Sequence, residues 1–259
     1  DTERVLGRII PQIPGAEKLK IATKVNPFPG RGASLSPTSV ASQFGQSLAL
    51  LGTKSVDVLY LHAPDPFTPL EQTLEACDIL HRQGKFQELG LSNFASWQVA
   101  HAWHICASRG WVKPTVYQGP YSCLARDVER ELIPCLRNFD IRFYAYNPLA
   151  GGLLTSGRYL ENADEVPESG RFSGESGQGA MYRDRYWKSE MFAALAVIDE
   201  ACRAFGVTVQ DAALRWLAHH SMLRAVRGDG VIVGASSVAH LKQNITAAKV
   251  GGPLPLPIV

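Results

Sequence analysis

A chain of 259 residues, of which 46% are hydrophobic and 19% charged, holds enough apolar side chains for the core of a globular, soluble protein. Its formal net charge of +2, the lack of long runs of like charge and the lack of an apolar run of about 18 residues argue against nucleic acid and membranes as partners. The five cysteines are odd in number and include no C-x-x-C pair, so we expect no disulfide framework and no metal site, but reduced thiols in the cytoplasm.

Along the chain, short apolar segments alternate with helical patterns. The predicted strands are residues 19–25, 56–63, 86–93, 114–121, 141–149 and 230–236. The predicted helices are residues 36–52, 68–84, 96–110, 125–140, 189–206 and 208–221. This alternation predicts repeated β/α units around parallel strands, and no composition shift marks a boundary, so we expect one domain over residues 1–259.

Some ends of these elements have clear signals. Ser36 suits an N-cap before Pro37, and Gly52 suits the C-terminal stop of the same helix. Thr68 and Glu71 have the spacing of a capping box. Residues 156–187 are rich in glycine, serine and glutamate and are too long for a routine connection, so we expect a lid or an unstructured loop there.

The predicted strands end in polar residues. These are Lys24, His62, Ser92 with Asn93, Gln118, Tyr146 with Asn147, and Ser236 with Ser237. Because ligands bind beyond the carboxyl ends of parallel strands, we read these residues as one set. Taken singly, each has an ordinary structural explanation. A histidine there is usually a hydrogen-bonded structural residue, a lysine can reach solvent from a strand end, and serines can cap the following helix.

No dinucleotide fingerprint, P-loop, nucleophile elbow or H-E-x-x-H motif is present in the sequence. The segments KIATKVNP, LYLHAPD, GKFQELGLSNF, PTVYQGPY, FYAYNPLAGGLLT and VIVGASSVAHLKQN resemble the aldo-keto reductases, above all the aflatoxin aldehyde reductase branch, aldo-keto reductase family 7. The resemblance covers the chain from about Lys20 to Asn244. It implies a (β/α)8 TIM barrel that binds NADPH at the carboxyl ends of its strands and reduces aldehydes and ketones.

The resemblance also implies roles for these residues. Lys24 and His62 would be catalytic, with His62 directed at the substrate carbonyl and Lys24 lowering the pKa of a neighbouring phenol. Tyr146 would stack on the nicotinamide, and Ser92, Asn93 and Gln118 would hydrogen-bond its carboxamide. Tyr182 and Arg185 would line the substrate pocket together with His62, and an arginine there would favour substrates that carry a carboxylate.

Further residues would bind the rest of the cofactor. By resemblance these are Asn147, Pro148, Leu149, Gly151, Gly152 and Leu154 with Arg171 around the pyrophosphate, and Ala235, Ser236, Ser237, Gln243 and Asn244 around a 2'-phosphate. Lys242 lies in the same stretch. The preference for NADPH over NADH follows from this group.

The family's catalytic tyrosine and paired aspartate lie upstream of the lysine strand, whereas no tyrosine precedes Lys24 in this sequence. We therefore expect a barrel that lacks its first one to two β/α units and its C-terminal tail, with about six of the eight strands. The sequence could be part of a longer enzyme, a truncated product, or a chain that a partner completes. We favour the first explanation, because the other site residues are all in place. The given chain by itself is then expected to turn over very slowly or not at all, because it lacks the proton donor.

The expected function is NADPH-dependent reduction of aldehydes or ketones, including semialdehydes with a carboxylate, to alcohols. The alternative is a catalytically silent NADPH-binding protein with a regulatory or redox-sensing role. The expected partner is a small carbonyl substrate, and the resemblance also suggests a homodimer.

Overall fold

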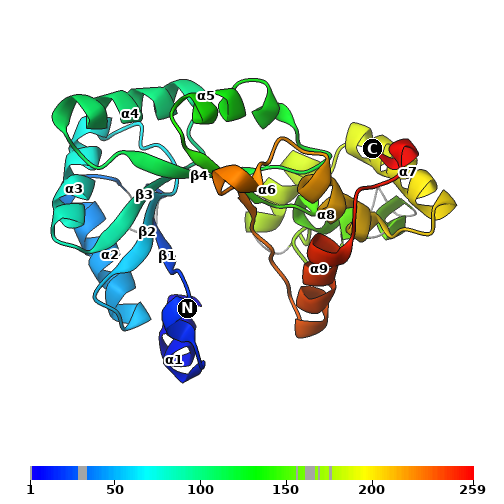
Figure 1. Ribbon diagram of the computed structural model, residues 1–259, viewed down its shortest axis with the longest axis horizontal. Helices are drawn as coiled ribbons and strands as arrows, with labels where there is room; N and C mark the ends of the chain where they lie inside the picture. Colours follow the sequence, from blue (N-terminus) through cyan, green and yellow to red (C-terminus); the bar gives the residue numbers. More distant parts are fainter. Residues whose placement is uncertain (1, 29–33, 156, 161–166, 169, 175–176) are drawn as a thin grey trace. The chain divides into compact units, whose positions relative to one another are not determined.

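The computed structural model (Figure 1) describes residues 2–28, 34–155, 157–160, 167–168, 170–174 and 177–259. By its internal contacts the chain forms two compact units. Unit 1 contains Asp1–Gln118 and Glu131–Phe143, and unit 2 contains Gly119–Arg130 and Tyr144–Val259. In the described part of the chain, six strands form a sheet whose order is the order of the chain.

The strands occur where the sequence predicts them, but all six are shorter than predicted. They are β1 (Ala22–Val25), β2 (Val56–Leu61), β3 (Phe86–Ser92), β4 (Pro114–Pro120), β5 (Arg142–Tyr146) and β6 (Gly230–Val231). The pairs β1–β2, β2–β3, β3–β4 and β5–β6 are parallel. In the last strand the regular pairing stops early, although the amide of Ile232 still donates to Ala145 O at 2.8 Å.

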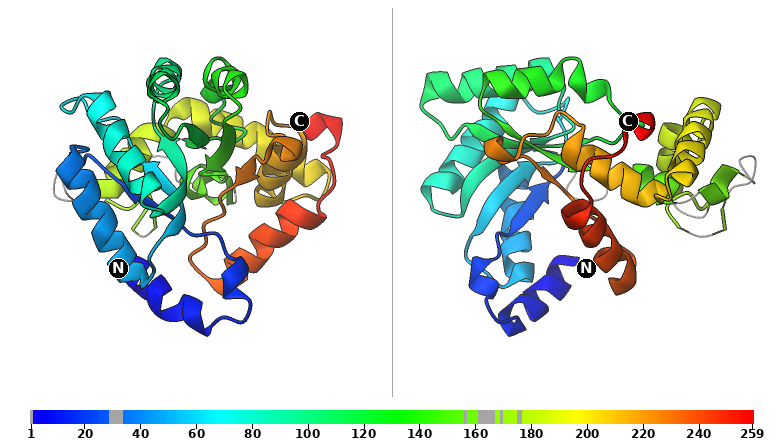
Figure 2. Two further views of the ribbon diagram at one scale, coloured as in Figure 1. Left: turned by 60° about the vertical axis from the view of Figure 1, so that its left-hand side comes forward. Right: turned by 45° about the vertical axis from the view of Figure 1, so that its right-hand side comes forward.

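In unit 1 a helix follows each of the first three strands. The helices are α1 (Thr2–Ile9), α2 (Pro37–Leu51), α3 (Leu70–Arg82), α4 (Ser96–Arg109) and α5 (Leu132–Asn138). Figure 2 shows α2, α3 and α4 along the outer side of β1–β4. The fully buried side chains Leu59, Leu61, Leu89 and Leu91 alternate along β2 and β3, so one face of this part of the sheet belongs to the apolar core.

Helix α2 has the ends that its sequence predicts. Ser36 occupies the N-cap position, although its hydroxyl makes no capping hydrogen bond. Pro37 opens the helix, and Gly52 ends it with a φ of 65°, a conformation that glycine adopts without strain. Val40, Phe44 and Leu51 are buried along one face, as an amphipathic helix requires. The helix therefore packs this apolar face against the core, and it contacts β1 of the sheet.

The start of α3 differs from the prediction. Its N-cap residue is Pro69, and no side chain caps the helix, so the capping box of Thr68 and Glu71 is wrong. The Thr68 hydroxyl donates instead to Asp65 Oδ2 at 2.8 Å. Asp65 also accepts the amides of Leu35 and Phe67, and this competing carboxylate explains the failure of the local rule.

Unit 2 contains the remaining helices of the described chain, which are α6 (Gly177–Tyr186), α7 (Ser189–Ala204), α8 (Val209–His219) and α9 (Val238–Val250). Residues 156–187 were expected to be a lid or loop, but 177–186 form α6 and 157–160 form a 3-10 turn. Residues 156, 161–166, 169 and 175–176 of that stretch lie outside the described residues. Helices α8 and α9 lie side by side (Figure 2).

In the described residues, no helix is both long enough and apolar enough to cross a membrane.

Candidate functional site

The predicted site residues of unit 1 lie at the carboxyl ends of adjacent strands. Lys24 of β1 is paired with Tyr60 of β2, and Ser92 of β3 is paired with Gln118 of β4. His62 follows β2 directly, and its amide still donates to Val25 O at 2.9 Å. Register partners in a parallel sheet share a face and every second residue returns to it, so Lys24, His62, Ser92 and Gln118 belong to the face opposite the leucine core.

Lys24 is half-buried beside an aromatic ring. Its Nζ atom lies 5.3 Å from the centroid of the Tyr60 ring, within the range of a cation-π contact. Burial lowers the pKa of Lys24, because the charged form loses hydration. The Tyr60 ring in turn covers Gly90, where an added Cβ would lie 2.3 Å from Tyr60 Cδ1. Gly90 therefore leaves the room that this pair occupies.

The position of His62 depends on Asn93. Asn93 has a φ of 61°, an uncommon backbone state for a residue with a side chain. In this state its Nδ2 donates to His62 O at 2.8 Å and to Ser92 Oγ at 3.1 Å. The His62 ring meets the Phe28 ring edge-on at 5.3 Å between centroids. Asn93 thus fixes the backbone of His62, and Phe28 contacts its imidazole.

In unit 2, a second group of predicted residues surrounds Asn147, which also has a positive φ of 55°. The Asn147 Nδ2 donates to the Tyr186 hydroxyl at 3.3 Å, and the Tyr182 hydroxyl donates to Asn147 Oδ1 at 3.2 Å. Arg171 Nη1 donates to the same Tyr182 hydroxyl at 2.6 Å. The structure therefore brings Asn147, Arg171 and Tyr182 together.

Arg185 joins this group through two phenols, since it is hydrogen-bonded to Tyr146 and Tyr186. Burial raises the pKa of Tyr146, and the charge and hydrogen bond of Arg185 offset part of that shift. The pKa of Tyr186 is raised by burial in the same way. Both phenols therefore keep their protons at neutral pH and can act as hydrogen-bond donors.

The predicted glycine turn follows β5 directly in the chain. Its members Asn147, Pro148, Leu149, Gly151, Gly152 and Leu154 form a tight turn that begins at the end of β5. Gly151 and Gly152 have φ values of 74° and 113°. An added Cβ on Gly151 would lie 2.6 Å from the Tyr182 ring, whereas one on Gly152 would meet no atom within 4 Å. The backbone is thus covered by Tyr182 on one side and open at Gly152.

The residues around the start of α9 divide into exposed and buried ones. Ser236 and Ser237 are exposed; the Ser237 hydroxyl caps α9 by accepting the His240 amide at 3.1 Å. Ala235 and Gln243 are also exposed. Asn244 is buried, is hydrogen-bonded to Gln210, and donates to Gly234 O at 3.2 Å. Its amide therefore supports the turn before α9.

Gly234 also links this turn to the arginine of the other predicted group. An added Cβ on Gly234 would lie 3.8 Å from Arg171 Nη2. The guanidinium of Arg171 is therefore close both to Tyr182 of α6 and to the turn before α9. This is the strongest convergence of the residues predicted to bind a cofactor.

Several residues of these groups were not found from the sequence. Tyr60, Tyr186 and Gln210 contact predicted residues, but each contact joins elements far apart in the chain, so no local spacing indicated them. Alternation along β2 could have placed Tyr60 on the face of His62, because the two are two residues apart.

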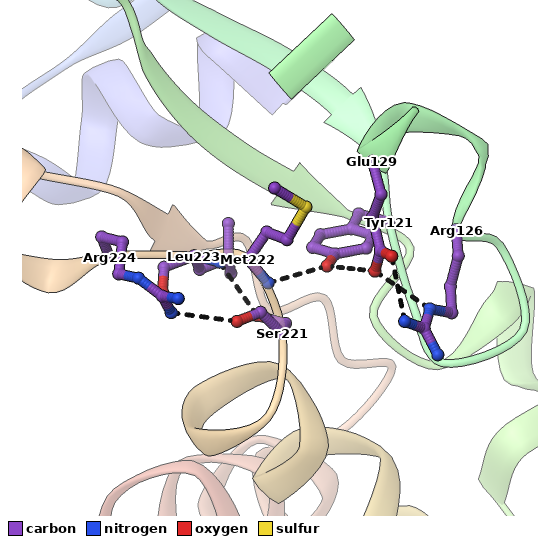
Figure 3. Close-up of polar contacts among 7 residues, drawn as sticks. All are labelled: Tyr121, Arg126, Glu129, Ser221, Met222, Leu223 and Arg224. Atoms are coloured by element: carbon purple, nitrogen blue, oxygen red, sulfur yellow. Dashed lines mark hydrogen bonds and ion pairs between the residues drawn. The ribbon is translucent and has the colours of Figure 1, made fainter. Parts of the chain in front are cut away.

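A network around Tyr121 was also missed (Figure 3). The buried Tyr121 hydroxyl accepts the Met222 amide at 2.9 Å and donates to Glu129 Oε1 at 2.7 Å, and Arg126 holds Glu129 with two further bonds. The Tyr121 amide donates to Tyr146 O at 3.1 Å. Burial and the Glu129 charge raise the pKa of Tyr121 to about 12. The network ties the turn after β4 to the end of β5 and to the segment before β6.

The five cysteines are free thiols. Burial raises the pKa of each of them, and for Cys77, Cys106 and Cys123 it does so to about 12. Thiols of this kind are poor nucleophiles at neutral pH. They are therefore not candidates for catalysis.

Comparison with known proteins gives a match over almost the whole chain. The model of the aldo/keto reductase family matches residues 1–255. Aflatoxin B1 aldehyde reductase member 2 from Homo sapiens is 50% identical over 255 residues, which are 96% of this chain and 70% of that protein.

Two other relatives are similar to this chain to about the same extent. The rat protein of the same name, from Rattus norvegicus, is 52% identical over 237 residues, 90% of this chain and 64% of its own length. Human aldo-keto reductase family 7 member A3 is 47% identical over 255 residues, 96% of this chain and 76% of that protein. The chain thus spans less than two thirds of the rat relative.

Proposed function

Because the chain belongs to the aldo/keto reductase family, we propose that it reduces aldehydes and ketones to alcohols with NADPH as hydride donor. The predicted resemblance to this family is confirmed, and its aflatoxin aldehyde reductase members are close relatives. The family has the (β/α)8 fold, and the described strands and helices alternate as that α/β class requires.

One observation carries the proposal most directly. Lys24, His62, Ser92 and Gln118 come from four adjacent strands of unit 1 and belong to one face at their carboxyl ends. Carbonyl reduction needs a polarised oxygen and a fixed geometry, and polar groups on rigid strand ends provide both. His62 donates a hydrogen bond to the substrate oxygen, and the Lys24 ammonium stabilises negative charge that develops nearby.

The donors of unit 2 fit an anionic dinucleotide. Arg171 supplies a guanidinium, Ser236 and Ser237 supply exposed hydroxyls, and the backbone at Gly152 is open to a ligand. When bound, NADPH supplies the hydride for the reaction. By the resemblance, Tyr146 would present its ring to the nicotinamide, and Ser92, Asn93 and Gln118 would bind the carboxamide. Gln243 and Lys242 belong to the proposed 2'-phosphate site, where Asn244 supports the backbone.

The proposed substrate class rests on the guanidinium of Arg185. Arg185 is hydrogen-bonded to two phenols, so its guanidinium is oriented before any ligand arrives. A planar guanidinium in this state suits a carboxylate. We therefore favour aldehydes that carry a carboxylate, such as short semialdehydes.

The activity is tested by the loss of NADPH absorbance with 2-carboxybenzaldehyde or a short semialdehyde. In the full-length protein we expect turnover, and a lower KM for an aldehyde with a carboxylate than for its methyl ester. The matched ester keeps the carbonyl and removes only the charge. An absence of turnover with every aldehyde, in protein shown to be folded, would contradict the proposal.

A second candidate is an NADPH-binding protein without turnover. It applies if no side chain is positioned beside Lys24 and His62 to give a proton to the alkoxide. Loss of a positioned general acid typically slows a reaction by ~10²–10⁴-fold. Calorimetry that finds NADPH binding, together with an absorbance assay that finds no turnover, would select this candidate.

We also propose a cytoplasmic location and a homodimer, the latter from the resemblance alone. Sedimentation equilibrium gives the oligomeric state directly. A mass equal to one chain at all concentrations would exclude the dimer.

A further inference from the structure

Helix α6 holds the segment that carries Arg171. Arg183 Nη1 donates to two consecutive backbone carbonyls, Phe172 O at 2.7 Å and Ser173 O at 3.0 Å. Phe172 and Ser173 are themselves buried. Residues 172 and 173 are thus attached to the helix by one charged side chain.

The backbone of this segment also lies directly against the helix. An added Cβ on Gly179 would lie only 1.9 Å from Ser173 O, so no other residue fits there without movement. Gly179 is buried, and the same Cβ would lie 3.1 Å from Arg183 Nη1. The absent side chain of Gly179 and the two hydrogen bonds from Arg183 Nη1 therefore act at the same contact.

Arg171 gains its orientation from the same helix. Its Nη1 donates to the Tyr182 hydroxyl at 2.6 Å, and its Cζ atom lies 5.3 Å from the centroid of the Tyr182 ring. Arg171 is itself exposed, so its guanidinium can reach a ligand. Arg183 binds the backbone of the two residues that follow Arg171 in the chain. Tyr182, which precedes Arg183 in α6, binds the Arg171 side chain.

We propose that Arg183 is a positioning residue for the cofactor site: it holds residues 172 and 173 against α6 and so presents the Arg171 guanidinium to the phosphates of NADPH. The proposal rests on the proposed function for the identity of the ligand. Both bonds leave one terminal nitrogen, Nη1, whose N–H groups are fixed in the plane of a guanidinium at the end of a long side chain, whereas a lysine ammonium is a freely rotating point charge on a shorter side chain.

The first test uses trypsin and needs no cofactor. In Arg183→Gln, we expect cleavage of the bond after Arg171 to be about tenfold faster, because the charged donor that holds the segment is lost. Mass spectrometry identifies this cleavage among the others. Unchanged cleavage after Arg171 would overturn the proposal.

Arg224→Gln is the matched control for this test. Arg224 Nη1 also donates to two backbone carbonyls of unit 2, Ser221 O and Leu223 O, each at 3.2 Å (Figure 3). We expect this variant to leave the cleavage rate after Arg171 unchanged. Equal acceleration in both variants would overturn the proposal, because it would mean general destabilisation of the unit.

The second test measures the Kd of NADPH by quenching of tryptophan fluorescence in a double-mutant cycle. We expect Arg183→Gln to raise the Kd about tenfold, and to have no further effect in the presence of Arg171→Gln. Arg183→Lys keeps the charge but should not restore affinity. Additive losses, or full affinity in Arg183→Lys, would overturn the positioning role.

The two tests separate this proposal from the proposed function. If the unmodified chain bound no NADPH, the proposed function and the cofactor part of this proposal would both be overturned. The trypsin result would still decide whether Arg183 holds the segment. NADPH binding that is unaffected by Arg183→Gln would overturn this proposal alone.

Discussion

At the residue scale, the candidate site consists of side chains whose neighbours leave them little freedom. Asn93 and Asn147 both have positive φ values, and both use their amide groups to hold a neighbouring candidate residue or segment. Strain of this kind is often found where a site fixes its geometry. Their position at the carboxyl ends of predicted parallel strands allowed Lys24, His62, Ser92 and Gln118 to be read as one set, but it could not reveal partners such as Tyr186 that come from distant elements.

His62 provides the most direct residue-scale prediction. We expect His62→Ala to lower kcat by ~10²–10³-fold, because the donor to the developing oxyanion is lost, and to change the Kd of NADPH little. Steady-state kinetics and fluorescence quenching measure the two effects. His101→Ala, at an exposed position of α4, is the control. A loss of NADPH affinity as large as the loss of kcat would show that His62 serves the cofactor.

Glu88 provides a prediction of pH dependence. Burial alone would raise the pKa of this carboxylate, but hydrogen bonds from Thr115 and Arg142 and the Arg142 charge hold the pKa below its usual value. A lowered folded-state pKa means that the stabilisation is complete above the unfolded-state pKa and is lost as the pH falls through the folded-state pKa.

We therefore expect Glu88→Gln to lower the free energy of unfolding by about 1–2 kcal/mol at pH 7 and by progressively less as the pH falls below about 4. Urea unfolding at several pH values measures this difference. Glu75→Gln, at an exposed position of α3, should show no such trend. A difference that grew toward acid pH would mean that the sign is wrong.

At the element scale, helices with local signals were predicted well and helices that depend on distant contacts were not. Ser36, Pro37 and Gly52 fixed both ends of α2 from the sequence alone. Helix α6 was missed because Gly177, Gly179 and many polar residues give it no apolar periodicity. Its contacts come from the 171–173 segment and from Asn147, and sequence spacing does not indicate either.

Because α2 is defined by local signals and α6 by a close contact with residue 173, we expect alanine to have opposite effects on stability at a glycine of each helix. Gly45→Ala in α2 meets no atom within 4 Å, so we expect it to stabilise the protein by about 1 kcal/mol through helix propensity. Gly179→Ala in α6 should instead destabilise the protein and weaken NADPH binding, because the new Cβ collides with Ser173 O. Thermal unfolding of both variants tests this, and stabilisation by Gly179→Ala would refute the close contact.

At the scale of the whole molecule, the chain passes from one unit to the other three times, at residues 118/119, 130/131 and 143/144. The first and third of these points lie inside β4 and β5. Neither unit is a single continuous segment, so the boundary was not visible in the composition of the sequence. The expectation of one domain remains a prediction, and cooperative unfolding is its test.

We expect Leu217→Ala to test that cooperativity. Leu217 of α8 is fully buried in unit 2, so its truncation should cost about 2–5 kcal/mol. If the chain unfolds as one domain, hydrogen exchange should accelerate equally in α8 and in β2 of unit 1. Val226→Ala, at a position that is 96% exposed, is the control. Faster exchange confined to α8 would show that the units unfold separately.

The burial of the cysteines has a chemical consequence for a protein proposed to handle aldehydes. With a pKa of about 12, a thiol is ionised to about one part in 10⁵ at pH 7, and only the ionised sulfur attacks electrophiles readily. Reactive carbonyl compounds that reach this chain therefore find few sulfur atoms with which to form adducts. We therefore expect the aldehydes proposed as substrates to form few adducts with the thiols of this chain.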